Sequence, residues 1–180
     1  MIGLLLLFHA SCIDDMVSNK YCNLPARFNF SPVNSISQLY TSCNSQGEWC
    51  TITLSKEKFY FTKANGSQGE VNRTAQDGYT GFYMGLSGFI VGLPNIPEVG
   101  ETYPVVTCYD LACRNCYEDE SGGYTRKKMV LREMGYAYCS HCRRTYNLNN
   151  TGQVSDGDAG KPLYRYRVYY GVNTLSINNP

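Results

Sequence analysis

Two Cys-x-x-Cys motifs constrain this chain more than any other feature. Cys113 and Cys116 form the first motif, Cys139 and Cys142 form the second, and 22 residues lie between them. A Cys-x-x-Cys turn aims both sulfurs at one point, and two such turns complete a tetrahedron of thiolates around a soft or borderline metal ion. The spacing therefore predicts a four-cysteine metal site, and 22 residues suffice for a β hairpin that brings the second motif over the first.

The chemistry of four thiolates favours a structural zinc ion, because no coordination position is left open for a substrate or a water molecule. Iron remains an alternative, as a mononuclear centre or a [2Fe–2S] cluster, since four cysteines ligate both. Two disulfides are the third alternative if the chain is exported. His141 lies inside the second motif. We expect it to face solvent, because Cys142 already completes that motif.

Basic residues gather around the two motifs. They either offset the negative charge of a four-thiolate zinc centre or form a solvated basic face. The formal net charge of the whole chain is only +1, and a nucleic-acid-binding zinc module would need a basic chain. We therefore expect no nucleic-acid partner. The basic residues concerned are Arg114, Arg126, Lys127, Lys128, Arg132, Arg143 and Arg144.

The N-terminus begins with a short apolar run that is too short to span a bilayer as a helix and is typical of a signal peptide. Its small residues precede Cys12 and resemble a bacterial lipobox, in which the cysteine becomes the lipidated N-terminus. Ile13-Asp14-Asp15 resembles the acidic export signal of surface lipoproteins in Bacteroidetes. We expect a signal peptide over 1–11, lipidation of Cys12 and a tether over 12–22. This predicts an outer-membrane lipoprotein on the periplasmic or cell-surface face; an ordinary secretory signal or a misassigned start is the alternative.

Four cysteines remain after the metal site and Cys12 are set aside. An exported protein can form disulfides, and Cys43 with Cys50 is the easiest pair to close because only six residues separate them. Cys22 and Cys108 complete the set, and sequence alone leaves the pairing open. The alternative is that Cys50 and Cys108 are buried thiols in apolar strands.

The remaining pattern predicts an all-β chain. Sixteen Tyr and 17 Gly residues favour strands and turns over helices. Apolar spacing predicts one short helix over 35–43, and apolar runs predict strands over 49–54, 58–62 and further along, seven to nine in all. Residues 63–78 are rich in Gly, Asn and Ser and are expected to form a loop. Near the end, Tyr164, Tyr166, Val168 and Tyr170 alternate with Arg165 and Arg167, which predicts a strand with the arginines on one face.

The segment from Val105 to Ile177 resembles Rieske-type domains, and the whole mature chain resembles Rieske-like lipoproteins of Bacteroidetes. The resemblance rests on the strand that leads into Cys113, on Cys142-Arg143-Arg144-Thr145-Tyr146, and on Gly157-Asp158-Ala159-Gly160-Lys161-Pro162-Leu163-Tyr164. It implies an antiparallel β sandwich or barrel over 23–180, with a rubredoxin-like or zinc-ribbon-like metal subdomain inserted at about 108–146. A Rieske cluster also needs two histidine ligands. Asn115, beside Cys116, and Cys142 occupy those positions, so four cysteines replace the Rieske ligand set.

The sequence contains no set of residues that is typical of a catalytic site. His141 is the single histidine after the signal peptide, which excludes histidine-based triads and histidine-ligated catalytic zinc. We therefore expect a non-enzymatic, lipid-anchored accessory or interaction subunit of an outer-membrane complex, with a protein partner in the envelope. The alternative function is electron transfer through a four-cysteine iron centre.

Overall fold

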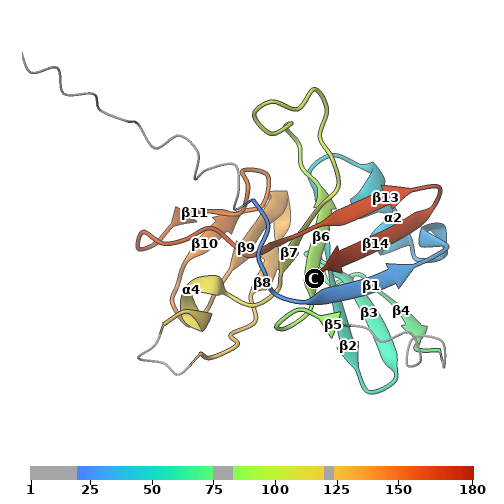
Figure 1. The fold of residues 1–180 in the computed structure, drawn as a ribbon, viewed down its shortest axis with the longest axis horizontal. Coiled ribbons are helices and arrows are strands. Elements are labelled where there is room, and N and C mark those ends of the chain that lie inside the picture. Colours follow the sequence, from blue (N-terminus) through green and yellow to red (C-terminus); the bar gives the residue numbers. More distant parts are fainter. Residues whose placement is uncertain (1–19, 75–82, 120–123) are drawn as a thin grey trace, which may run out of the picture.

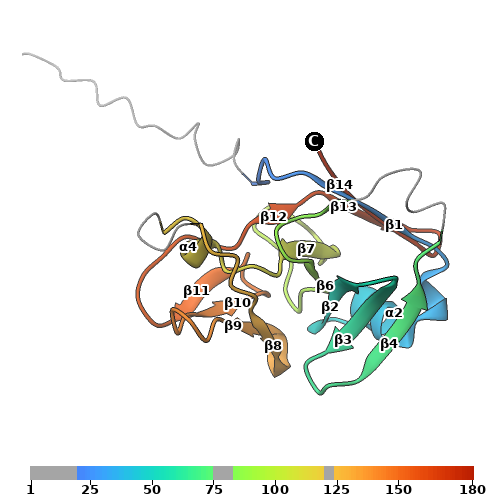
Figure 2. The same ribbon diagram turned by 90° about the horizontal axis from the view of Figure 1, so that it is seen from below.

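The computed structural model describes residues 20–74, 83–119 and 124–180. The described chain forms three antiparallel sheets and two short α-helices, so it is mostly β and the prediction of an all-β chain is confirmed in part. Figures 1 and 2 show two sheets facing one another, while the third sheet stands to one side. No helix in the described part of the chain is long and apolar enough to cross a membrane.

The largest sheet has six strands, and its central strands are buried on both faces. Cys50, Ile52 and Val91 face one core, whereas Trp49 and Ile90 face the other. This explains why the central strands lack a clean polar alternation. In order, the strands are β12 (Arg165–Tyr166), β7 (Thr107–Asp110), β6 (Phe89–Leu93), β2 (Glu48–Ser55), β3 (Lys58–Lys63) and β4 (Gln68–Asn72).

A four-stranded sheet covers one face of the six-stranded sheet. Its order is β13 (Val168–Gly171), β14 (Thr174–Asn179), β1 (Ala26–Phe30) and β5 (Tyr83–Met84). The ring of Phe28 lies 5.3 Å from that of Phe59, and Phe30 lies 5.0 Å from Phe61, so aromatic side chains join the two sheets. The 3-10 turn η1 (Val33–Ser35) and helix α2 (Ser37–Asn44) close this first core, into which Leu39 is fully buried.

The third sheet belongs to an insertion between β7 and β12, two strands that pair with each other. The chain leaves the six-stranded sheet after Asp110 and returns at Arg165, so we call residues 111–164 the inserted subdomain. Tyr109 from the large sheet packs with Leu131 and Leu148 from the insertion in the second core. The insertion contains α4 (Arg114–Tyr117), β8 (Val130–Arg132), η3 (Glu133–Gly135), β9 (Tyr136–Tyr138), β10 (Thr145–Asn147) and β11 (Gln153–Asp156), in sheet order β11-β10-β9-β8.

Several predicted elements need correction. Helix α2 matches the expected helix at 35–43, but α4 is a second helix, so the prediction of one helix is incomplete. Residues 63–78 are not simply a loop, because β4 forms there as a polar edge strand held by its hydrogen-bonded ladder with β3. The inserted subdomain, 111–164, overlaps the predicted metal subdomain at about 108–146, whose first residues, 108–110, lie in β7. The predicted signal peptide, Cys12 and most of the 12–22 tether lie outside the described residues.

The predicted strand near the C-terminus is divided in two, because β12 pairs with β7 whereas β13 pairs with β14. Arg165, in β12, is only 8 % exposed. Its guanidinium bonds to the carboxylate of Glu98 and, at 3.4 Å, to the hydroxyl of Thr107. A buried arginine of this kind depends on partners that are distant in sequence, which a periodicity argument does not detect.

Candidate metal centre

The first motif forms one turn of helix at the start of the inserted subdomain. The amide of Cys113 donates to the carbonyl of Lys127 at 2.8 Å, which ties the motif to the strand-like segment before β8. Helix α4 follows directly, and the amide of Tyr117 donates to the carbonyl of Cys113 at 3.0 Å. This helical turn places Cys116 beside Cys113.

The second motif forms the tight turn between β9 and β10. The amide of Cys139 donates to the carbonyl of Arg144 at 3.0 Å, and the amide of Arg143 donates back to the carbonyl of Cys139 at 2.8 Å. Arg143 adopts a left-handed backbone conformation with φ of 61°, which closes the turn after Cys142. β8 and β9 pair antiparallel between the two motifs, as the predicted hairpin requires, and β9 leads directly into the second turn.

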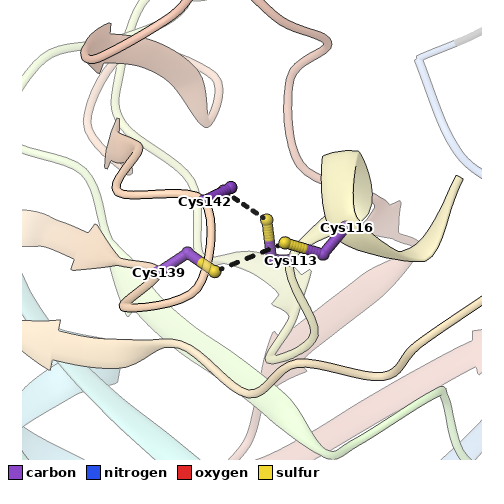
Figure 3. A group of neighbouring side chains, drawn as sticks. All are labelled: Cys113, Cys116, Cys139 and Cys142. Carbon is purple, nitrogen blue, oxygen red and sulfur yellow. Dashed lines mark hydrogen bonds between the residues drawn. The ribbon is translucent and has the colours of Figure 1, made fainter. Parts of the chain in front are cut away.

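The four sulfurs converge as the spacing predicts (Figure 3). The Sγ atoms of Cys113 and Cys142 lie 3.6 Å apart, as do those of Cys116 and Cys139. All four ligand atoms lie within 4.8 Å of one another. Zinc–sulfur bonds of about 2.3 Å in a tetrahedron place sulfurs about 3.8 Å apart. A disulfide needs about 2 Å. The geometry of this four-cysteine cluster therefore suits a single metal ion and not two disulfides.

Most of the four-cysteine cluster is buried. Cys113 and Cys139 are fully buried and Cys116 is nearly so, whereas Cys142 is partly exposed. The cluster thus lies within the second core, with one edge near the surface at Cys142. Such a site excludes bulk water from three of its four ligands, which is typical of a structural rather than a hydrolytic centre.

Hydrogen bonds already favour a negative charge at Cys139. The thiol of Cys113 and the backbone amides of Cys142 and His141 donate to this sulfur, and they lower the pKa of Cys139 to about 4. The same contact with Cys139, together with burial, raises the pKa of Cys113, and burial raises the pKa of Cys116 to about 12. A metal ion would therefore displace protons from the other thiols on binding.

Two side chains that sequence reasoning did not assign to the site support Cys113. The hydroxyl oxygen of Tyr146 lies 3.1 Å from its sulfur, and that oxygen accepts a hydrogen bond from the amide of Asn115 at 2.9 Å. The hydroxyl proton of Tyr146 is thus free to point at Cys113. Tyr146 is one of sixteen tyrosines, and nothing in the sequence distinguishes it from the others.

Asn115 also joins the segment that returns to the six-stranded sheet to helix α4. Its amide nitrogen donates to the carbonyl of Lys161 at 2.8 Å, and its amide oxygen accepts from the Lys161 amide at 2.9 Å. A Cβ atom at Gly160 would lie 2.7 Å from that oxygen, so only glycine fits there without a shift. Asn115 therefore joins helix α4 to the segment that returns to the six-stranded sheet.

A second polar network links α4 to the end of the inserted subdomain. Glu118 accepts hydrogen bonds from Arg114 at 2.8 Å, from Lys161 at 2.7 Å and from the Tyr164 hydroxyl at 2.6 Å. Partial burial acts to raise the pKa of Glu118, but these three donors outweigh it and lower the pKa to about 2. The charged carboxylate of Glu118 therefore holds helix α4 against residues 161–164.

His141 and the basic residues near the motifs divide into different roles. His141 is exposed, as expected, and its Nδ1 lies 3.6 Å from the sulfur of Cys116 without joining the ligand group. Arg144 hydrogen-bonds to Cys142, which raises the pKa of the arginine, and its Nε donates to the carbonyl of Asp158 at 2.9 Å. At least one of the seven basic residues therefore compensates charge at the cluster.

The other predicted site residues lie apart from the cluster. Cys43 on α2 and Cys50 on β2 are both buried in the first core, where the structure has no bond between them. Burial raises the pKa of each, to about 12 for Cys50, so neither is a reactive thiolate. The disulfide between them stays a prediction. Cys108 is a buried thiol as well, and Cys12 lies outside the described residues.

No protein-family model, curated protein sequence or solved structure matches this chain. The resemblance to Rieske-like lipoproteins therefore stays a prediction. The candidate metal centre depends on its own geometry, with the buried four-cysteine cluster as its evidence.

Proposed function

We propose that this protein is a non-enzymatic, lipid-anchored component of the cell envelope. Its four-cysteine cluster would hold one zinc ion in a structural role. The observation that carries the proposal is the convergence of four sulfurs within 4.8 Å from two turns that are far apart in sequence. Zinc has no redox chemistry, accepts four thiolates and prefers a tetrahedron. These properties fit a cluster that is buried on most sides.

The structural zinc ion would stabilise the inserted subdomain. This segment of 54 residues, 111–164, has one small sheet and shares its apolar core with the larger sheet. A metal ion would join α4, which carries Cys116, to the β9–β10 turn, which carries Cys139. Structural zinc contributes folding free energy directly, so a subdomain with a small core gains most from it.

Electron transfer through a mononuclear iron ion is the second candidate. It is favoured by one observation, the partial exposure of Cys142, which brings one edge of the cluster to the surface where a redox partner would dock. A [2Fe–2S] cluster fits less well. Its two cysteine pairs bind different iron atoms and lie farther apart than sulfurs that share one ion, whereas all four sulfurs here lie within 4.8 Å.

A Rieske-like frame remains part of the proposal. It is supported by the way a cysteine-bearing sheet is inserted between β7 and β12 of a larger antiparallel sheet. The ligand set is different, because Asn115 is engaged with Tyr146 and Lys161. We therefore propose that the chain keeps the architecture for assembly and has no Rieske redox centre.

The envelope location and the role of accessory subunit rest on the sequence around Cys12. Lipidation there would hold the folded part at the outer membrane, where a protein partner of an envelope complex would bind. Metabolic labelling with an alkynyl fatty acid tests the anchor, with Cys12→Ser as the matched control. Label on the native chain and none on the variant supports it, and an unlabelled native chain contradicts it.

Elemental analysis of protein purified without added metal tests the centre. We expect about one zinc ion per chain and no visible absorbance, because Zn²⁺ has a filled d shell. Iron with visible charge-transfer bands would replace the zinc proposal with the electron carrier. A metal-free protein in which the four cluster cysteines are free thiols, or form two disulfides, would contradict both.

A further inference from the structure

The loop between β6 and β7, residues 94–106, carries apolar side chains that neither core uses. Ile96 is 54 % exposed, Tyr103 is 76 % exposed and Val99 is fully exposed. Figure 1 shows this segment, which we call the projecting loop, standing away from the sheets in olive green. Val105 on the same loop is also exposed. Single exposed apolar residues are ordinary on protein surfaces, but four on one short loop are typical of an interaction surface.

The projecting loop presents its tip in a defined conformation. The amide of Glu101 donates to the carbonyl of Glu98 at 2.9 Å, which closes a tight turn. Gly100 has φ of 91° at the third position of this turn, and Val99 occupies the second. Pro97 precedes the turn and restricts its backbone. Val99 is therefore held outward by the turn, and little ordering is needed when it contacts a partner.

The proposed tether enters the described structure beside this loop. Nζ of Lys20, the first described residue, lies 2.9 Å from a carboxylate oxygen of Glu98. Arg165 bonds to the same carboxylate, and its guanidinium lies 5.7 Å from the ring of Tyr21. These contacts fix the start of the folded part at the base of the tip turn. Cys12 precedes Lys20 by eight residues. A chain of that length spans at most about 29 Å.

We propose that the projecting loop is a membrane-contact surface that places Ile96, Val99 and Tyr103 in the bilayer to which Cys12 is anchored. The inference rests on the lipid anchor of the proposed function. The anchor keeps the loop within reach of the lipid, which raises its effective concentration at the membrane. Tyrosine is enriched in the interfacial region of a bilayer, and the transfer of aliphatic side chains from water into that region is favourable in free energy.

The charges at the base of the loop are consistent with such contact. The carboxylate of Glu98 is compensated by both Lys20 and Arg165, so its approach to lipid does not carry an unpaired negative charge. Glu101 is exposed on the other side of the turn. Zwitterionic lipid is therefore the appropriate probe, because an anionic surface would repel this second carboxylate.

A tryptophan at the tip tests the inference. The full-length lipidated protein carries either Val99→Trp or the matched control Val172→Trp, and it is reconstituted in phosphatidylcholine vesicles with or without brominated acyl chains. Val172 is also fully exposed, but it lies in the turn between β13 and β14. The native Trp49 is buried in the second core and contributes the same background to both variants. We expect a blue shift and bromine quenching for Val99→Trp and neither for Val172→Trp.

The outcomes separate this inference from the anchor itself. Fatty-acid label on Cys12 combined with an unshifted, unquenched Val99→Trp overturns the membrane-contact surface and leaves the anchor intact. A chain without label overturns the anchor, and the membrane-contact surface with it. A Val99→Trp emission that shifts only when the protein is isolated with an envelope partner, without bromine quenching, assigns the loop to a protein contact and overturns the lipid assignment.

Discussion

The hydroxyl of Tyr146 lies 3.1 Å from the sulfur of Cys113. Tyr146 lies in β10, whereas Cys113 directly precedes helix α4. Asn115 donates to the same hydroxyl at 2.9 Å, so the phenol proton is directed at the sulfur. A donor of this kind stabilises the thiolate that binds the metal and fixes its direction. Tyr146 is thus a positioning residue for the candidate centre.

Removal of that hydroxyl is expected to weaken metal binding without unfolding the protein. Loss of an outer-shell hydrogen bond typically costs about 10–100-fold in metal affinity, so Tyr146→Phe should lie in this range. Competition with a chromophoric zinc chelator measures the change. Tyr169→Phe is the control, because Tyr169 is 64 % exposed on β13. Equal affinities for both variants would show that the contact with Cys113 is incidental.

Loss of a ligand should act on the inserted subdomain before the rest of the chain. Cys139→Ser removes one of four thiolates, and we expect loss of bound metal together with rapid amide hydrogen exchange across 111–164. The six-stranded sheet should exchange more slowly, because it has a separate first core. Cys50→Ala is the control at a buried cysteine outside the cluster and should keep the metal. Native-like protection of 111–164 in Cys139→Ser would contradict a structural role for the centre.

The sequence predicts the metal centre better than it predicts the fold around it. Cysteine spacing is local, because each Cys-x-x-Cys turn is closed by its own backbone, so the motifs alone predict which four cysteines converge. Tyr146 was not identified, because its contact with Cys113 depends on how β10 packs against the first motif. Arg165 is a similar case: its burial follows from Glu98, which lies 67 residues earlier in the chain.

Strand prediction failed where the apolar signal is weak. β4 has the sequence Gln-Gly-Glu-Val-Asn, and it exists because β3 offers a full set of backbone partners along its edge. Short strands of this kind are determined by tertiary contacts and not by propensity. The double-sided burial of β6 and β7 likewise depends on the insertion, which returns to the sheet only at Arg165.

A methyl group in the middle of β6 should destabilise the whole protein. A Cβ atom at Gly92 would lie 2.3 Å from the carbonyl oxygen of Glu48 and 2.5 Å from the ring of Trp49, so backbone and indole must both move. Overpacking of this kind costs about 1–3 kcal/mol in the free energy of unfolding. Urea unfolding of Gly92→Ala measures the loss. An unfolding free energy of Gly92→Ala equal to that of the native chain would contradict close packing at β2 and β6.

The ion-pair network at Glu98 should make stability depend on pH. Burial acts to raise the pKa of this carboxyl, but Lys20 and Arg165 outweigh burial and hold the pKa below its ordinary value of 4.5. A carboxyl with a depressed pKa in the folded state stabilises the protein above the ordinary value, and this contribution is lost as the pH falls below it. Native protein should therefore lose more stability between pH 6 and about pH 3 than Glu98→Gln, in which the titrating group is absent.

Unfolding midpoints in urea at the two pH values measure this difference, and the comparison cancels contributions from other groups, including the cysteines. Glu101→Gln is the matched control, because Glu101 is an exposed glutamate on the same loop. It should keep the full pH dependence of the native chain. The network with Lys20 and Arg165 is partly buried, so we expect the Glu98 contribution to be about 1 kcal/mol. If Glu98→Gln and Glu101→Gln lose stability equally on acidification, the ion pairs that hold Lys20 against the projecting loop do not persist in solution.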